Sequence, residues 1–273
     1  MGTALPVSKS ASKSAGVSKA AQAAAVVLPE VHFSDWGDVR HMHLETEWIQ
    51  GSMRIDDPTA LVHEYIQRMF AWMLFVEPDK VPNLQALQLG LGAGSLTKFC
   101  HKVLRMQTTA IELNPQVIAA CRGWFKLPAN TKRMQVVLGN AAEEIRQAPW
   151  QASVDALQVD LYDAQAAAPV LDSEAFYADC LTTLTEHGCM TVNLFGRSSS
   201  YKRSLQKMAK AFGSDALWAF KATREGNTVV LAQRTSQRPD RKLLVQRAEL
   251  IQARWGLPAL KWIKGFKPVE LQS

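Results

Sequence analysis

The strongest constraint on the fold is a regular alternation of short apolar runs with amphipathic segments between residues 86 and 195. The apolar runs have strand length, and the segments between them carry apolar residues at helical spacing. Strands joined by helical crossovers are parallel, so the pattern predicts an α/β fold with a doubly wound, mostly parallel sheet. The predicted strands are residues 86–91, 109–113, 134–138, 156–161 and 189–195, and the predicted helices are residues 95–104, 115–125, 141–148 and 173–184.

Two segments on either side of this pattern extend the predicted architecture. After it, the apolar runs 216–221 and 228–233 predict an antiparallel hairpin that closes the sheet. Before it, apolar and polar residues alternate on both sides of Gly51 from about residue 41, which predicts a β-hairpin. A helix is then predicted to begin near Pro58 and to cover one face of the sheet, because apolar residues recur at helical spacing. These are Leu61, Val62, Tyr65, Ile66, Met69, Phe70 and Met73.

The composition divides the chain into four expected regions. Residues 1–30 are rich in Ala, Ser and Lys and predict a disordered tail, while a transit peptide is disfavoured because arginine is absent. Residues 31–80 form the predicted N-terminal hairpin and helix, and residues 81–237 the main α/β domain. Residues 238–273 are basic and amphipathic, which predicts a helical extension packed on that domain, with contact to RNA or an acidic partner as the alternative.

Charge, cysteine content and hydropathy narrow the function classes. The net charge of +6 comes from the two ends of the chain, so it gives no electrostatic support for nucleic-acid binding by the core. The cysteines have no paired short spacing and predict reduced core residues, and the isolated His41 and His43 do not predict a metal site. No apolar run approaches the ~20 residues that span a bilayer, so we expect no membrane segment and a cytoplasmic location.

The segment after the first predicted strand indicates a nucleoside site. Gly90, Gly92 and Gly94 allow a sharp turn and close approach of a ligand to the backbone, although tight packing of strand on helix would also explain them. Glu112 ends the next strand about twenty residues later, where a carboxylate can accept hydrogen bonds from ribose hydroxyls. The alternative is a solvated carboxylate at a strand end.

The third and fourth strands deliver polar residues to the same edge. Asn140 and Ala141 follow the third strand, where an amide can read an adenine ring, and Asp160 and Asp163 follow the fourth. Each strand thus delivers a polar residue to one rim, although Asp is also common in loops because it bonds nearby backbone groups.

Four blocks of this sequence resemble the spermidine synthase-like proteins, the polyamine aminopropyltransferases. They read "GLGAGSL", "IELNPQVIAACRGWF", "VVLGNAAEEI" and "VDLYDAQAAAPVLDSEAFYADCLTTLTEHGCMTVNLF". The resemblance spans roughly residues 38–235 and implies the class I methyltransferase fold, with a mostly parallel seven-stranded sheet.

The resemblance also implies a reaction and its residues. An aminopropyl group would pass from decarboxylated S-adenosylmethionine to a small-molecule amine in polyamine biosynthesis, with no metal. Asp160 matches the catalytic acid–base and Asp163 the residue that contacts the amine, while Glu112 matches the ribose-binding acid. The sequence leaves the oligomeric state undecided, and a homodimer is one option. In the amine pocket the resemblance places His63, Glu64 and Tyr162, with Val62 where the family has a tyrosine.

Two departures from the family pattern affect the expected donor. Ala93 stands where the family has an aspartate that binds the donor's ammonium, and Asn140 replaces an aspartate. We therefore expect weak preference for the decarboxylated donor, with intact S-adenosylmethionine binding at least as well. A methyltransferase and a catalytically silent nucleoside-binding relative are the alternatives, and the retained carboxylates argue against the silent one.

Overall fold

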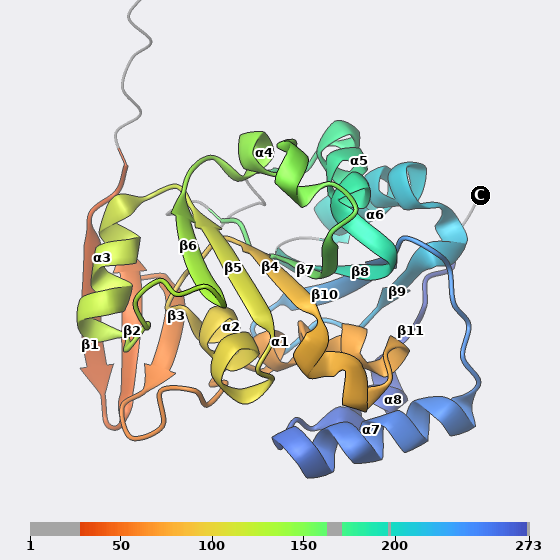
Figure 1. Cartoon of the computed structure of the whole chain (residues 1–273), viewed down its shortest axis with the longest axis horizontal. Coiled ribbons are helices and arrows are strands. Elements are labelled where there is room, and N and C mark those ends of the chain that lie inside the picture. The colour runs from red at the N-terminus through yellow and green to blue at the C-terminus, as the bar shows by residue number, and fades with distance from the viewer. Residues whose placement is uncertain (1–27, 163–170, 196–197, 272–273) are drawn as a thin grey trace, which may run out of the picture.

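The computed structural model describes residues 28–162, 171–195 and 198–271. Its centre is an eight-stranded sheet of order β11-β9-β10-β8-β7-β4-β5-β6 (Figure 1). The strands from β4 to β8 pair in parallel, whereas β10 runs antiparallel to β8 and β9. The strands are β4 (Gln85–Leu89), β5 (Gln107–Glu112), β6 (Met134–Leu138), β7 (Val154–Val159), β8 (Leu184–Phe195), β9 (Leu217–Ala219), β10 (Asn227–Gln233) and β11 (Lys267–Pro268).

This sheet confirms the predicted α/β class, the mostly parallel order and the closing hairpin β9–β10. It exceeds the expected seven strands only by β11, which is two residues long and pairs with β9. A strand this short has no alternation to detect in the sequence. The chain leaves β4 towards β5 on one side and reaches β7 on the other, so the sheet has a switch point at the carboxyl end of β4.

The crossover helices follow the predicted segments, but two are shorter. The predicted helix 95–104 splits into α2 and the π-helical segment η3 (Phe99–Val103), and the predicted helix 141–148 shrinks to α4 followed by the 3₁₀ helix η4 (Ala148–Trp150). The crossover helices are α2 (Ser95–Lys98), α3 (Pro115–Trp124), α4 (Ala141–Glu144), α5 (Glu174–Thr183) and α6 (Ser198–Phe212), and the short 3₁₀ helix η5 (Ser214–Ala216) precedes β9.

A separate antiparallel sheet precedes the main sheet and lies beside α3 in Figure 1. It contains β1 (Val31–Trp36), β2 (Val39–Leu44) and β3 (Ile49–Arg54). The hairpin β2–β3 confirms the predicted one, and β1 adds a strand that we did not predict. Gly51 on β3 lies against the glycine turn, since a Cβ on it would be 2.6 Å from the backbone nitrogen of Ala93. This contact docks the small sheet on the main domain.

The long helix predicted from Pro58 onwards is wrong in length. The chain forms only α1 (Glu64–Arg68) and then the 3₁₀ helices η1 (Ala71–Phe75) and η2 (Pro78–Asn83). Asp57 Oδ1 accepts hydrogen bonds from the backbone nitrogen and hydroxyl of Thr59, a local pattern that competes with helix. The side chains of η1 are all buried, so tertiary packing rather than helical periodicity decides the backbone there.

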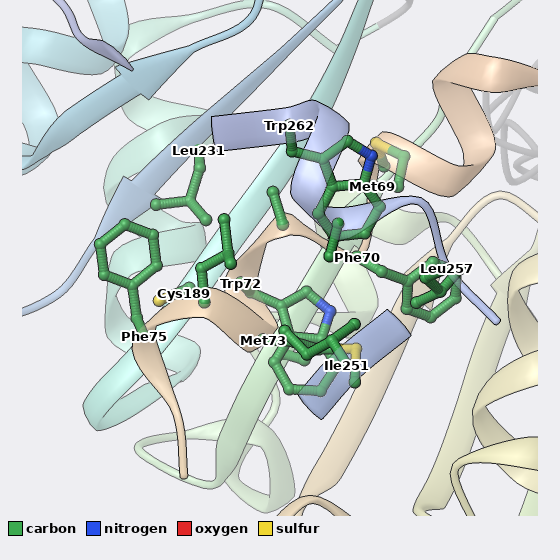
Figure 2. Close-up of a cluster of buried hydrophobic side chains, with 14 of the residues drawn as sticks. Met69, Phe70, Trp72, Met73, Phe75, Cys189, Leu231, Ile251, Leu257 and Trp262 are labelled. Atoms are coloured by element: carbon green, nitrogen blue, oxygen red, sulfur yellow. The ribbon is translucent and has the colours of Figure 1, made fainter. Parts of the chain in front are cut away.

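The largest hydrophobic cluster holds these turns against the sheet and the C-terminal helices α7 (Arg241–Trp255) and α8 (Ala259–Gly265) (Figure 2). Figure 2 shows Trp72 and Met73 beside Ile251, and Trp262 above Phe70. The basic extension therefore buries one apolar face, which includes Leu244, Ile251 and Trp262, in the main core, while Arg254 forms an ion pair with Asp79 on η2.

Some of the remaining predictions concern residues that the structure does not describe. Residues 1–27, most of the predicted disordered tail, lie outside the described residues, as does Asp163. The four cysteines are free and buried, as predicted. None of the helices in the described ranges has the length and apolar content to cross a membrane.

Candidate active site

A cavity of about 1040 Å³ opens at the carboxyl edge of the parallel strands. Its walls come from β2, β3, the start of α1, the glycine turn and the ends of β5, β6, β7 and β8. Among the described residues, the predicted site residues that line it are His63, Glu64, Gly90, Gly92, Glu112, Asn140, Ala141, Asp160 and Tyr162. Gly94 lies behind the wall, where it precedes α2.

The glycine turn after β4 requires its glycines because of backbone conformation. Gly90, Gly92 and Gly94 have φ values of +89°, +48° and +68°, which residues with a Cβ rarely adopt. A Cβ on Gly90 would also collide with the carbonyl oxygen of Asp160. The turn therefore lies directly against the loop that carries this carboxylate, and Ser95 Oγ donates to the Ser52 carbonyl oxygen 3.0 Å away to tie β3 to the same place.

Glu112 is held by the backbone on both carboxylate oxygens. Oε2 accepts from the backbone nitrogen of Leu91 at 3.0 Å, and Oε1 accepts from that of Asn114 at 2.8 Å. Burial raises the pKa of Glu112, and hydrogen bonds from backbone N–H groups oppose that rise. A carboxylate has about four acceptor sites, and the backbone N–H groups of Leu91, Asn114 and Leu113 use three of them, so Glu112 can fix the turn and still accept from a ligand hydroxyl.

Asn140 has a structural role at the start of α4. Its Oδ1 accepts from the backbone nitrogen of Ala142 at 3.0 Å, and its Nδ2 donates to Glu143 at 3.3 Å. This is an ordinary helix cap, and it would equally suit an aspartate. Ala141 beside it is buried in the core under the cavity wall.

Asp160 is the most perturbed carboxylate in the cavity. Its Oδ1 accepts from Asn193 Nδ2 at 2.9 Å, and it also accepts a hydrogen bond from Tyr65. Burial raises the pKa of Asp160 to about 6, and these two hydrogen bonds act in the opposite direction. Tyr162 donates its hydroxyl to the carbonyl oxygen of Asn193 at 2.8 Å, so the same strand, β8, positions both side chains.

Sequence reasoning missed Tyr65 and Asn193 as site residues. The sequence pattern marked Tyr65 only as an apolar position of the predicted helix. The family has a tyrosine directly before the histidine, where this chain has Val62, and Tyr65 supplies a hydroxyl near His63. Val62 in place of the family's tyrosine was the sequence signal that could have pointed to Tyr65. Asn193 lies within a buried strand, and an isolated polar residue there was a second signal.

His63 and Glu64 separate in the structure. His63 Nε2 lies 2.7 Å from Ser52 Oγ, and its ring stacks on that of Tyr65 with centroids 5.9 Å apart. Glu64 is exposed at the cavity rim and forms an ion pair of 2.6 Å with Arg68. The histidine therefore belongs with Tyr65 and Asp160, while the glutamate is neutralised by its neighbour one turn along α1.

The cavity wall is negatively charged. No lysine or arginine lines it within the described part of the chain, and five carboxylates besides that of Glu64 do. Such a wall favours ligands that carry ammonium or sulfonium charge and disfavours anions. These carboxylates are Glu45, Glu47, Glu112, Asp160 and Glu225.

Solved structures share the fold. A probable spermidine synthase from Corynebacterium glutamicum matches with a TM-score of 0.68 at 18% identity, over 89% of this chain and 93% of that one. Human methyltransferase-like protein 13, in complex with SAH, matches with a TM-score of 0.61 at 21% identity, over 77% of this chain and 96% of that one. A spermidine synthase in complex with the transition-state analogue AdoDATO matches with a TM-score of 0.52 at 17% identity, over 84% of this chain and 89% of that one. These likenesses support the class I methyltransferase type of sheet.

Curated relatives settle the family, although no family model matches the chain. A polyamine aminopropyltransferase from Neisseria meningitidis serogroup A is 30% identical over 242 residues, covering 88% of this chain and 90% of the relative. A polyamine aminopropyltransferase from Chromobacterium violaceum is 31% identical over 248 residues, covering 90% of this chain and 92% of the relative. The similarity noted in the four sequence blocks is thereby confirmed. The chain belongs to the polyamine aminopropyltransferase family, a family of transferase enzymes.

Proposed function

We propose that this protein transfers an aminopropyl group from decarboxylated S-adenosylmethionine to a small-molecule amine. The observation that carries the proposal is the cavity itself, in which a glycine turn and strand-end carboxylates face one space without lysine or arginine among its described lining residues. Both substrates are cations, and the wall is acidic. The adenosyl ligands of the two solved complexes support an adenosyl co-substrate.

In this proposal the adenosine half of the donor lies along the glycine turn. Glu112 accepts from the ribose hydroxyls at the acceptor site that its backbone donors leave free. Gly90 and Gly92 give the donor close access to the backbone, and the base lies near Asn140 and Ala141.

The reaction takes place where Asp160 meets the donor. The amine nitrogen attacks the carbon next to sulfur, the carbon–sulfur bond breaks with its electrons on sulfur, and methylthioadenosine leaves. The new secondary ammonium then passes a proton to Asp160, which is mostly ionised at neutral pH because its pKa is about 6. Tyr162 lines the pocket beside it, and Asp163 positions the amine in the role that the family pattern assigns to it.

Ala93 favours a second candidate, transfer of a methyl group from intact S-adenosylmethionine. Ala93 is buried in the turn with no charge to offer a donor ammonium, so discrimination by this position is lost. The acidic wall repels the carboxylate of intact S-adenosylmethionine, which lowers its affinity independently of Ala93. From Ala93 we expect intact S-adenosylmethionine to bind at least as well as its decarboxylated form. Ala93→Asp should reverse this order, because it adds one charge-assisted hydrogen bond to the donor ammonium, worth about tenfold in affinity.

Calorimetry of the purified protein with S-adenosylmethionine, its decarboxylated form and methylthioadenosine, followed by product analysis with a diamine, tests the proposal. Aminopropylated amine and methylthioadenosine are the expected products. A methylated product would establish the second candidate, and binding of none of the three ligands would establish a silent relative. A melting curve of Ala93→Asp serves as the control for folding, because the side chain packs against Gly51.

A further inference from the structure

A buried serine hydroxyl lies between two histidine rings at the edge of the cavity. Ser52 Oγ is 2.8 Å from His41 Nδ1 and 2.7 Å from His63 Nε2. Ser52 is 1% exposed and His41 8% exposed, so the first pair is shielded from water. The three residues come from β3, β2 and the position before α1, and Ser52 and His63 line the cavity. This arrangement lies outside the roles assigned above.

The hydroxyl can donate only one proton, and this couples the two rings. If Ser52 donates to His41 Nδ1, it accepts from His63, and both rings carry their proton on Nε2. If it donates to His63 Nε2, it accepts from His41, and both rings carry their proton on Nδ1. A chain of donated hydrogen bonds through Ser52 therefore requires the same tautomer in both rings.

We propose that Ser52 and His41 are positioning residues that hold His63 in its Nε2–H tautomer, with Nδ1 as a proton acceptor for the amine substrate. The inference rests on the proposed aminopropyl transfer. His63 Nε2 faces Ser52, so Nδ1 is the ring nitrogen left for the cavity that His63 lines. Stacking on Tyr65, which is bonded to Asp160, places the ring beside the carboxylate.

The surroundings of both rings keep them neutral before substrate arrives. Burial lowers the pKa of His63, His41 lowers it further, and Glu225 opposes this. Burial likewise lowers the pKa of His41, with His43 acting in the same direction and Asp35 against it. Asp35 is bonded to Arg40, which weakens its field at His41. Both rings are therefore uncharged at neutral pH, and His63 has a free lone pair.

The proton balance assigns separate steps to His63 and Asp160. An ammonium that becomes a neutral secondary amine gives up two protons. The first passes to His63 Nδ1 and frees the lone pair that attacks the donor. The resulting imidazolium donates Nε2–H to Ser52 Oγ, which donates to His41 Nδ1, so the charge is stabilised without a further transfer. The second proton passes to Asp160 after attack.

Ser52→Ala tests the positioning role through its pH dependence. We expect kcat/KM for the amine to fall about tenfold near pH 7, less than the 10² to 10⁴ of a general base itself. The loss should shrink towards about pH 10, where more of the amine arrives neutral, and donor affinity should not change. A loss of equal size at every pH would show a purely structural role and overturn the proposal, as would a native rate.

The chain offers a matched control in the same small sheet. Ser34 Oγ lies 2.9 Å from His43 Nε2, and neither residue lines the cavity. Ser34→Ala removes a comparable serine–histidine contact and should leave the rate and its pH profile unchanged. Ser52→Thr keeps the hydroxyl and should restore most of the rate, with melting curves to verify that each variant folds.

Nitrogen NMR of the histidine rings tests the coupling without any activity measurement. We expect His41 and His63 of the native protein both to be Nε2–H, and Ser52→Ala to release His63 into a tautomer mixture. Different tautomers in the two rings, or Nδ1–H in both, would contradict the proposal. If the native protein transfers no aminopropyl group, the proposed function fails, while the NMR result still decides whether Ser52 couples the rings.

Discussion

The two halves of the cavity are built in different ways. The donor half, defined by Gly90, Gly92 and Glu112, consists of the turn that directly follows β4 and the last residue of β5, and Glu112 is held by backbone N–H groups. In the acceptor half, defined by His63, Tyr65, Asp160 and Asn193, side-chain hydrogen bonds join Asn193 and Tyr65 to Asp160, and ring stacking joins His63 to Tyr65. Asn193 lies 33 positions from Asp160 in the sequence.

This difference shows that the geometry of the acceptor half depends on packing in the core. The position of α1 is set by its carboxyl end, where the carbonyl oxygen of Met69 accepts from Gln158 Nε2 at 3.1 Å and Thr191 Oγ1 at 3.0 Å. Both donors are buried in the sheet, so their hydrogen bonds are strong and specific in direction. The acceptor half is therefore sensitive to the packing of distant elements, whereas the donor half depends on local backbone conformation.

Asp160→Asn should produce the largest effect, and it should act on the acceptor half alone. We expect turnover to fall by about 10² or more, the range for loss of a general base, while affinity for methylthioadenosine stays close to native. Single-turnover kinetics and calorimetry measure the two quantities separately. A native turnover rate would remove Asp160 from the proton-transfer role, and a matching loss of nucleoside affinity would show that the halves are not independent.

Glu112→Gln should produce the reverse pattern, with weaker nucleoside binding by about 1 to 3 kcal/mol and a smaller change in turnover at saturating donor. The amide offers one acceptor oxygen where the carboxylate offers two, so either a backbone N–H or a ribose hydroxyl loses its partner. Glu186→Gln, on an exposed position of β8, is the control for loss of charge. Unchanged affinity would exclude the ribose role.

Asn193→Leu should produce the smallest effect, a displacement of the pH profile. Asn193 donates to the ionised carboxylate of Asp160 and so lowers its pKa, which burial has raised to about 6. Without that donor the pKa rises, so activity should be lost at a higher pH as the solution is acidified, by about one pH unit. The turnover rate as a function of pH measures this, and an unmoved acidic limb would separate Asp160 from that limb.

The sequence alone determined the parallel sheet and most of the donor half. Period and turn chemistry act over a few residues, so the strands ending at Leu89, Glu112 and Leu138 and the glycines after the first of them can be recognised from the order of the amino acids. The resemblance added the catalytic role of Asp160 and the choice of His63, and both residues line the same cavity.

Only the tertiary structure decided how α1 and the small sheet complete the acceptor half. The predicted long helix gives way to the short α1 and the 3₁₀ helix η1, whose side chains are all buried, so tertiary packing rather than helical periodicity decides the backbone there. Tyr65 reaches Asp160, and Ser52 joins His41 to His63. These contacts link elements through packing and hydrogen bonds across the core, and no local pattern in the sequence encodes which side chains meet there.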